Sequence, residues 1–263
     1  TRSSARPPLT QILKNTQLLR LDIGIFSLHA MLTATFIAIP IVLTHTIQLS
    51  EIEQIILYLL VLVFAFITMV PLIIVAEKKR KMKPIFIAAV LTLTLMQVLL
   101  ATQHHSALSI GLILLCFFTA FTLLEASLPS LVSKISPIRN KGAAMGIYSS
   151  SQFLGIFFGG SVGGWLHGHM GVNAIFIFCA VMGAIWVLVA STMSPPPYLS
   201  TLVFSFNKNE LEKIDPIIAQ LKHLPGVTEA ILMGEDNALY LKVDKQKISE
   251  DELRKTIREG TLA

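Results

Sequence analysis

Long apolar stretches alternate with short polar connections between residues 23 and 192. Six of these stretches are about 20 residues long, which is roughly what a helix needs to cross the hydrocarbon of a bilayer. They lie at 23–43, 54–75, 84–101, 107–132, 143–166 and 173–192. Six such helices in succession would leave a water-soluble protein without polar surface. The pattern therefore predicts an all-α polytopic membrane bundle of six transmembrane helices, embedded in the lipid bilayer.

The composition agrees with this prediction. Apolar residues make up 53% of the chain and charged residues 14%, whereas roughly a quarter of the residues of a soluble domain are charged. The mean hydropathy is +0.69. These values exclude an ordinary water-soluble globule.

Basic residues are distributed unevenly among the connections between the six stretches. The segment 1–20 carries four, the connection after the second stretch five, and the connection after the fourth stretch three. The other connections, 44–53, 102–106 and 167–172, carry none. By the positive-inside rule, both termini are cytoplasmic in a multi-pass protein of the cell inner (plasma) membrane. The net charge of +5 is then a topology signal, and we expect no nucleic-acid partner.

The composition changes after the proline-rich linker Ser194-Pro195-Pro196-Pro197. Alternating residues predict a strand over 201–206, and apolar spacing predicts a helix around 214–221. Asp215-Pro216 either starts that helix or kinks one that began near Asn209. Two further strands, 227–233 and 238–243, form a hairpin around the turn 234–237.

A Ser249-x-x-Glu252 capping box then opens a last helix. The predicted order is βαββα, which corresponds to a small α+β ferredoxin-like domain with its last strand missing. The predicted domains are a six-transmembrane-helix bundle over 1–196, with a cytoplasmic N-terminal segment over 1–20, and a cytoplasmic ferredoxin-like domain over 197–263.

Three polar side chains share one predicted depth in the membrane. His29 is nine residues from Arg20, Glu125 nine from Lys134, and Gln152 eleven from Lys141. At 1.5 Å per residue, His29, Glu125 and Gln152 lie roughly 13–17 Å from the cytoplasmic face, close to the midplane. Polar groups at that depth are costly and mark candidate functional sites.

Each of these side chains has a purely structural alternative. His29 can hydrogen-bond to a neighbouring helix, and Gln152 can hold two helices together. Glu125 has no basic partner in its own span, so its carboxyl is a candidate for proton exchange and coupling; the alternative is a buried structural bond. Gln97, nearer the periplasmic end of the third span, fits a structural role.

Glycines recur at intervals of four in the fifth span. Gly155, Gly159 and Gly163 allow the backbones of two helices to approach closely. This pattern serves static packing, or an interface that repacks as the protein changes conformation. The sequence does not separate these alternatives.

Glu77 and Lys78 begin a charged run where the second span ends. Such a run is typical of a solvated loop that sets topology. The alternative is a gating loop in which Glu77 is anchored at the positive N-terminus of the fifth predicted helix, near Gly142.

Two sequence blocks carry a resemblance to a known family. They read EASLPSLVSK at 125–134 and KGAAMGIYSSSQFLG at 141–155. Both resemble the C-terminal half of transporters of the major facilitator superfamily, most of all the YajR-type members, which carry a ferredoxin-like domain after their last span. The resemblance covers essentially the whole chain.

The resemblance implies that the six spans correspond to helices 7 to 12 of twelve. It implies a central cavity lined by helices 7, 8, 10 and 11, and on that mapping His29, Glu125, Gln152 and Tyr148 are substrate-binding or proton-coupling residues. It also implies a partner, the missing N-terminal six-helix half. The loop motif of the family is degenerate here, because Ile73 and Arg80 stand at its glycine positions.

The resemblance implies a secondary active transporter, with proton-coupled export of small organic molecules as the expected function. The alternative is a non-transporting, truncated membrane protein whose cytoplasmic domain regulates or assembles other proteins. A homo-oligomer of six-span chains is a third possibility. No nucleotide-binding loop or catalytic motif indicates an enzyme, and we expect no cofactor. We also expect no metal, because the loop 207–209 lacks the cysteines of metal-binding plaits.

Overall fold

The computed structural model describes residues 9–102, 106–206, 211–233 and 237–262 of the chain. It divides into two compact units. The first comprises Thr1–Ser136 with Asn140–Pro196, and the second comprises Pro137–Arg139 with Pro197–Ala263.

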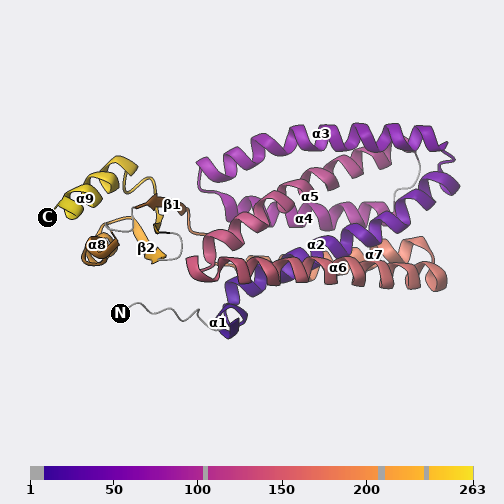
Figure 1. The fold of residues 1–263 in the computed structure, drawn as a ribbon. Helices are drawn as coiled ribbons and strands as arrows, with labels where there is room; N and C mark the ends of the chain where they lie inside the picture. The colour runs from indigo at the N-terminus through magenta and orange to yellow at the C-terminus, as the bar shows by residue number, and fades with distance from the viewer. Residues whose placement is uncertain (1–8, 103–105, 207–210, 234–236, 263) are drawn as a thin grey trace. The chain divides into compact units, whose positions relative to one another are not determined.

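The first unit is a bundle of seven helices within the described residues (Figure 1). A short π-helical turn, Val42–Thr46, extends α2, and a 3-10 turn, Ile138–Asn140, precedes α6. The helices are α1 Leu9–Leu13, α2 Thr16–Ile41, α3 Glu51–Lys78, α4 Met82–Thr102, α5 Ala107–Ile135, α6 Lys141–Met170 and α7 Val172–Ser191. Each of the six predicted spans lies within one helix from α2 to α7, except that the first continues into the π-helical turn and the last ends one residue beyond α7.

Five of the described helices are long and apolar enough to cross a membrane: α2 with its π-helical extension, α3, α4, α5 and α7. The fifth predicted span is a helix, α6, but its composition does not meet the same criterion. Its 30 residues include eight glycines and four serines, which lower its mean hydropathy. Five of the six predicted spans therefore meet this criterion, and the other, α6, is a long glycine-rich helix of the same bundle.

Polar residues start several of these helices by satisfying free backbone N–H groups. The Asn15 side chain accepts hydrogen bonds from the backbone N–H groups of Gln17 and Leu18 at the start of α2. Ser50 and Glu53 form a capping box at the start of α3. These caps explain why the helices begin several residues before the apolar stretches that predicted them.

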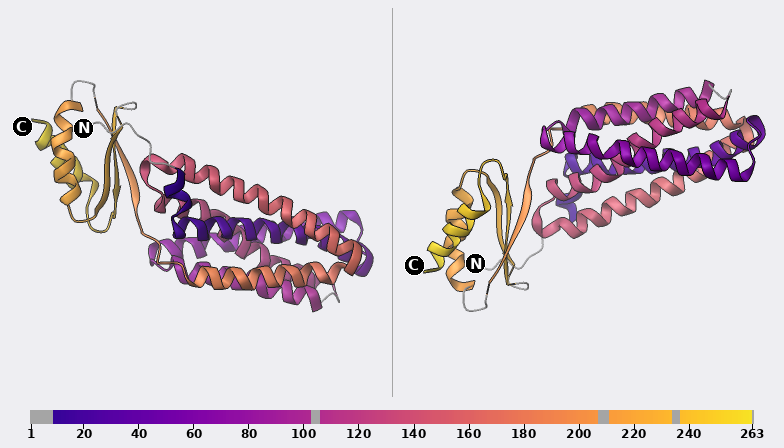
Figure 2. Two further views of the ribbon diagram at one scale, coloured as in Figure 1. Left: turned by 90° about the horizontal axis from the view of Figure 1, so that it is seen from below. Right: turned by 90° about the horizontal axis from the view of Figure 1, so that it is seen from above.

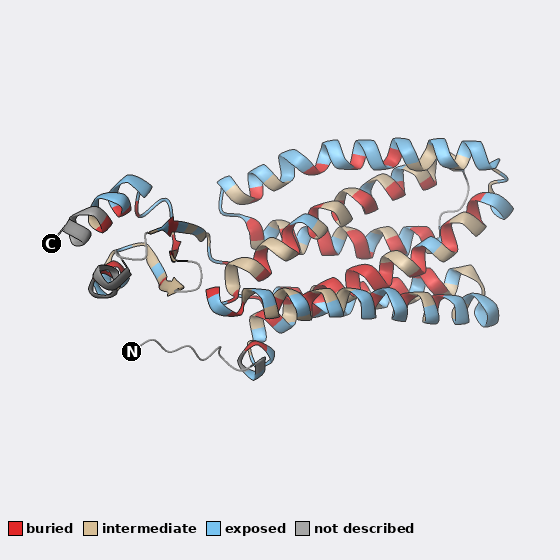
Figure 3. Ribbon diagram, in the orientation of Figure 1, coloured by how far each residue is buried: buried red, intermediate tan, exposed pale blue. Residues whose placement is uncertain are grey.

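Helix α2 is the most enclosed of the long helices. It packs against α6, α7 and α5, while α4 lies against α7 and α5, and α3 against α5 (Figures 1 and 2). Burial follows this arrangement: α2 buries most of its length, whereas α3 exposes a long apolar face (Figure 3). An apolar face of that kind is suited to lipid or to further membrane helices.

The contact between α2 and α6 depends on glycine. A Cβ atom at Gly155 would overlap the backbone carbonyl of Phe26, and one at Gly159 would overlap that of Ala30. Gly163 continues the series against Ala34. The three predicted packing glycines therefore allow backbone-to-backbone contact along one side of α6.

The second unit contains a three-stranded antiparallel sheet in the order β1-β3-β2. Its elements are β1 Ser200–Ser205, α8 Leu211–His223, β2 Val227–Met233, β3 Ala238–Val243 and α9 Glu250–Leu262, which confirms the predicted βαββα order. Both helices lie on one face of the sheet (Figure 2). Phe204, Leu221, Leu241 and Leu253 belong to the core between them.

Two details of this unit concern earlier predictions. Helix α8 already includes positions 215 and 216, so the alternative in which Asp215-Pro216 starts the helix is wrong. Asn209 and most of the turn 234–237 lie outside the described residues. At α9, the Glu252 backbone N–H donates to the Ser249 hydroxyl over 3.2 Å, as the predicted capping box requires.

Candidate functional site

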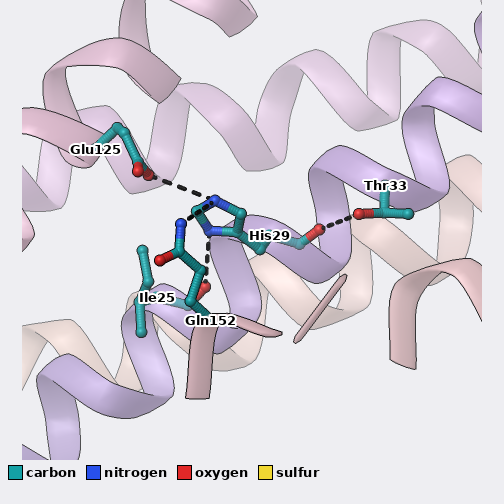
Figure 4. Close-up of polar contacts among 5 residues, drawn as sticks. All are labelled: Ile25, His29, Thr33, Glu125 and Gln152. Atoms are coloured by element: carbon teal, nitrogen blue, oxygen red, sulfur yellow. Dashed lines mark hydrogen bonds and ion pairs between the residues drawn. The ribbon is translucent and has the colours of Figure 1, made fainter. Parts of the chain in front are cut away.

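His29 on α2 and Gln152 on α6 are in direct contact. The Nε2 atoms of the two side chains lie 2.8 Å apart, although the residues are 123 positions apart in the chain (Figure 4). The His29 side chain is almost fully buried, at 7% exposure. Thr33, one turn further along α2, donates its hydroxyl to the His29 backbone carbonyl and does not touch the ring.

The second ring nitrogen of His29 identifies the tautomer. Nδ1 lies 3.3 Å from the backbone carbonyl oxygen of Ile25, which can only accept a hydrogen bond. Nδ1 therefore carries a hydrogen, and in the neutral ring Nε2 accepts one from the Gln152 amide. The geometry is that of a neutral histidine with both ring nitrogens satisfied.

Glu125 on α5 is the third member of this group, the His29 cluster (His29, Glu125 and Gln152). Its Oε2 atom lies 3.7 Å from Nε2 of His29 (Figure 4). That oxygen is buried and has no hydrogen-bond partner among the described residues, although the side chain as a whole is 39% exposed. A buried carboxylate oxygen without a hydrogen-bond partner is costly.

A second protonation state of the cluster follows from these contacts. A protonated His29 has a hydrogen on Nε2 and needs an acceptor there. Glu125 Oε2 is the nearest charged acceptor, and rotation of the Gln152 amide presents its oxygen instead. The cluster thus has two hydrogen-bond patterns that differ by one proton on His29.

Aromatic rings surround this cluster on the α5 side. Phe121 lies edge-on to the His29 ring, with 5.9 Å between the ring centroids. Phe117 and Phe118 each pack against Phe121. An apolar surround of this kind strengthens the electrostatic interactions within the cluster.

Tyr148, also predicted for this site, lies one turn before Gln152 on α6. Its side chain is 4% exposed, and its buried hydroxyl has no hydrogen-bond partner among the described residues. The structure therefore brings all four predicted residues into one region of the bundle.

Sequence reasoning did not select Asp22. This carboxyl residue lies on α2, seven residues before His29, and is 9% exposed. It was passed over because it precedes the apolar stretch that begins at residue 23. The spacing of seven residues, about two helical turns, is the sequence signal that places Asp22 and His29 on one face of the helix.

Glu77 forms an ion pair with Lys134 near the end of α5, with 2.6 Å between Oε1 and Nζ. The structure places its carboxylate against this lysine, and not at the N-terminus of α6, as the gating alternative required. Lys78, the last residue of α3, is exposed.

Gln97 takes part in a separate buried contact. Its amide nitrogen donates to the Thr35 hydroxyl over 2.7 Å, linking α4 to α2. Within the part of the chain that the structure describes, no three His, Cys, Asp or Glu side chains are grouped so that they could hold a metal ion.

Comparison with known proteins places the chain in a family. The model of the Major Facilitator Superfamily matches residues 21–233. The chain belongs to this superfamily. It is a multi-pass membrane protein, and five of its helices are long and apolar enough to cross the bilayer.

Two relatives extend this finding. The chain is 38% identical to the inner membrane transport protein YajR of Escherichia coli (strain K12) over 253 residues, which are 95% of this chain and 55% of the relative. It is 32% identical to an uncharacterized transporter of Buchnera aphidicola subsp. Baizongia pistaciae (strain Bp) over 182 residues, which are 68% of this chain and 46% of the relative. The chain thus spans about half the length of these relatives.

Proposed function

We propose that this chain is the C-terminal, six-helix half of a secondary transporter in the inner membrane, which exports small organic molecules in exchange for protons. In this proposal α6 crosses the membrane with the five apolar helices, and both termini are cytoplasmic. The His29 cluster carries the proposal, because it joins a histidine, an amide and a carboxylate from three different helices.

The proton step uses the two hydrogen-bond patterns of the cluster. When His29 is neutral, Nε2 accepts from Gln152 on α6. When His29 is protonated, Nε2 donates to Glu125 on α5 or to the rotated Gln152 amide. Donation to Glu125 would change which of two helices His29 contacts, and such a change can bias a two-state packing equilibrium.

The glycine contacts support a conformational role for this region. Gly155 and Gly159, which follow Gln152 on α6, bring that helix into direct backbone contact with α2 near the His29–Gln152 bond. An interface without interlocking side chains at these positions can shift with little steric obstruction. Alternating access in which helix pairs move around a midplane site would use this property.

The second unit extends the proposal. Its βαββα order and its β1-β3-β2 sheet support its assignment as a ferredoxin-like domain without the last strand. We assign it a regulatory or assembly role on the cytoplasmic side, because within the described residues β1 pairs only with β3 and leaves an edge to which another strand can add.

The test is proton-linked flux in liposomes that contain the complete protein and an internal pH-sensitive dye. Addition of transported organic molecules should move protons across the membrane, and Glu125→Gln should abolish this movement while insertion stays intact. Glu51→Gln, at the exposed start of α3, is the matched carboxyl control and should transport normally. Unchanged pH-dependent flux in Glu125→Gln would show that the carboxyl is only structural.

A further inference from the structure

The connection between α5 and α6 belongs to the second unit and not to the helical bundle. Its residues Pro137–Arg139 group with Pro197–Ala263, although α5 ends at Ile135 and α6 begins at Lys141. The Ile138 side chain is only 7% exposed. Most connections between helices run over the surface, whereas this one buries an apolar side chain that would be exposed to water if the connection moved away.

The sheet of the second unit has two different faces. Leu241 and Val243 of β3 belong to the core that also contains residues of α8 and α9. Because successive side chains of a strand point to opposite faces, Lys242 lies on the face away from these helices. Glu229 of β2 is its register partner and shares that face. Lys242 is nevertheless only 4% exposed, so the sheet is also covered on this side around Lys242.

Glu229 joins this face of the sheet to the connection. Both of its carboxylate oxygens accept from the backbone N–H of Ile138, over 3.3 Å each. Its Oε2 atom also lies 3.9 Å from Nζ of Lys242. Hydrogen bonds to an ionised carboxylate are roughly twice as strong as those between neutral groups. The contact therefore holds Ile138 through its backbone, and the buried lysine supplies the opposite charge.

The two helices that this connection joins carry two members of the His29 cluster. Glu125 lies on α5 and Gln152 on α6. Rigid helices carry a displacement of their ends along their length. A contact that is made in one arrangement of the helix ends stabilises that arrangement relative to others. The bond between Glu229 and Ile138 thus favours one arrangement of α5 and α6.

We propose that the second unit is a clamp on the bundle of its own chain. The face of its sheet that carries Glu229 and Lys242 holds the connection Pro137–Arg139 and restrains the movement of α5 against α6. This inference rests on the regulatory role proposed for the second unit and names what that unit regulates. Release of Ile138 frees the adjoining ends of both helices.

The experiment is hydrogen–deuterium exchange, measured by mass spectrometry on the complete protein in lipid nanodiscs. In Glu229→Ala the Ile138 N–H loses its acceptor. The amides of 132–144, which include the last turn of α5 and the first turn of α6, should then exchange about tenfold faster, the effect expected when one hydrogen bond to a charged group is lost. Glu229→Gln keeps one acceptor oxygen and should give an intermediate rate.

Matched variants separate the clamp from a general fold defect. Glu250→Ala removes an exposed carboxylate that pairs with Arg254 on α9 of the same unit, and it should leave the exchange of 132–144 unchanged. The connection 79–81 between α3 and α4 should exchange at the wild-type rate in every variant. Continued protection of β2 and β3 shows that the second unit is folded.

A second variant removes the donor in place of the acceptor. Ile138 is the first residue of a 3-10 turn, a position that tolerates proline because the ring sets a helical φ angle. Ile138→Pro has no N–H for Glu229 and leaves the pair of Glu229 and Lys242 in place. It should speed exchange of the flanking amides as Glu229→Ala does, and it decides the question if Glu229→Ala unfolds the second unit.

The clamp and the transport mechanism fail in different ways. Wild-type exchange over 132–144 in folded Glu229→Ala or in Ile138→Pro would overturn the clamp. Faster exchange confined to the second unit would also overturn it, because the contact would then hold only the sheet. These measurements require no transported molecule, whereas normal proton-linked flux in Glu125→Gln would reject the transport mechanism and leave the exchange result unaffected.

Discussion

Glu77, near the end of α3, and Lys134, in the last turn of α5, form an ion pair with 2.6 Å between Oε1 and Nζ. The lysine side chain is 18% exposed and the glutamate side chain 40%. The pair ties together the ends of two helices that pack along their length. It also places a cation at the end of α5, where the helix dipole favours positive charge.

Reversal of one charge in this pair should lower the melting temperature of the detergent-solubilised protein. Because Glu77 is substantially exposed, the interaction contributes about 1 kcal/mol or less. Glu77→Lys should lower the melting temperature. The double variant Glu77→Lys with Lys134→Glu restores opposite charges and should recover most of that loss. Lys79→Glu, at an exposed position two residues away, is the control for a change of charge alone. A double variant that melts no higher than Glu77→Lys would contradict a specific ion pair.

The effect of a glycine-to-alanine substitution in α6 on the stability of the protein should depend on its position. Gly159→Ala places a methyl group inside the backbone carbonyl of Ala30, so α2 and α6 must move apart, at a cost of about 1–3 kcal/mol. Gly164→Ala meets nothing within 4 Å and should be neutral or stabilising by up to about 1 kcal/mol through helix propensity. Thermal unfolding of the two variants is the measurement, and similar melting temperatures would argue against the close contact.

The ring of His29 should be a neutral Nδ1–H tautomer in the wild-type protein near neutral pH. Solid-state NMR of labelled histidine distinguishes this tautomer from the Nε2–H form and from the cation. Gln152→Glu replaces the amide donor with a group that only accepts, so His29 should then remain protonated. Thr33→Val is the control, because it removes a hydrogen bond to the backbone of His29 but none to its ring, and it should leave the spectrum unchanged. An Nε2–H ring in the wild type would contradict the assignment.

Cysteine-accessibility labelling should reproduce the charge asymmetry of the connections. We expect cysteines at positions 48 and 106 to react from the periplasmic side, and cysteines at 79, 139 and 213 only from the cytoplasmic side. The reason is the absence of Lys and Arg from alternate connections. Reaction of a cysteine at position 79 from outside would reject this topology.

The edge strand β1 should drive self-association of the second unit. Within the described residues β1 pairs only with β3, which leaves its other edge open to another strand. An isolated fragment over 198–263 should be marginally stable, as expected for roughly 65 residues with an incomplete sheet, and should dimerise. Val203→Pro at this exposed position should reduce dimerisation in sedimentation experiments, whereas a wild-type fragment that stays monomeric and melts at high temperature would contradict the prediction.

The positions of the helices and strands could be predicted because the signals for them are local. Apolar runs located α2 to α7, and the alternation of residues located β2 and β3 at the bounds that the structure shows. The apolar signal is weakest for α6, whose glycines lower its hydropathy. Glycine serves there to bring two backbones together, a property that a hydropathy sum does not measure.

The depth argument selected residues that lie close together in the structure, without revealing how they interact. Counting from basic residues put His29, Glu125 and Gln152 at one level, and the structure shows two of them in contact and the third 3.7 Å away. Depth follows from the fixed rise per residue of a helix. The direction in which each side chain points does not follow from this rise, because it depends on how the helices rotate about their axes when they pack.

The sequence by itself determined the class of the protein, the bounds of its elements and the residues eligible for chemistry, since these follow from hydropathy, periodicity and charge along one segment at a time. Only the tertiary structure decided that Glu77 pairs with Lys134 and that Gln152 holds the neutral form of His29. It also decided that Asp22 is buried and that the buried Tyr148 hydroxyl has no hydrogen-bond partner among the described residues. Each of these features depends on how separate helices pack, and for His29 and Gln152 the glycine contact brings α2 and α6 close together.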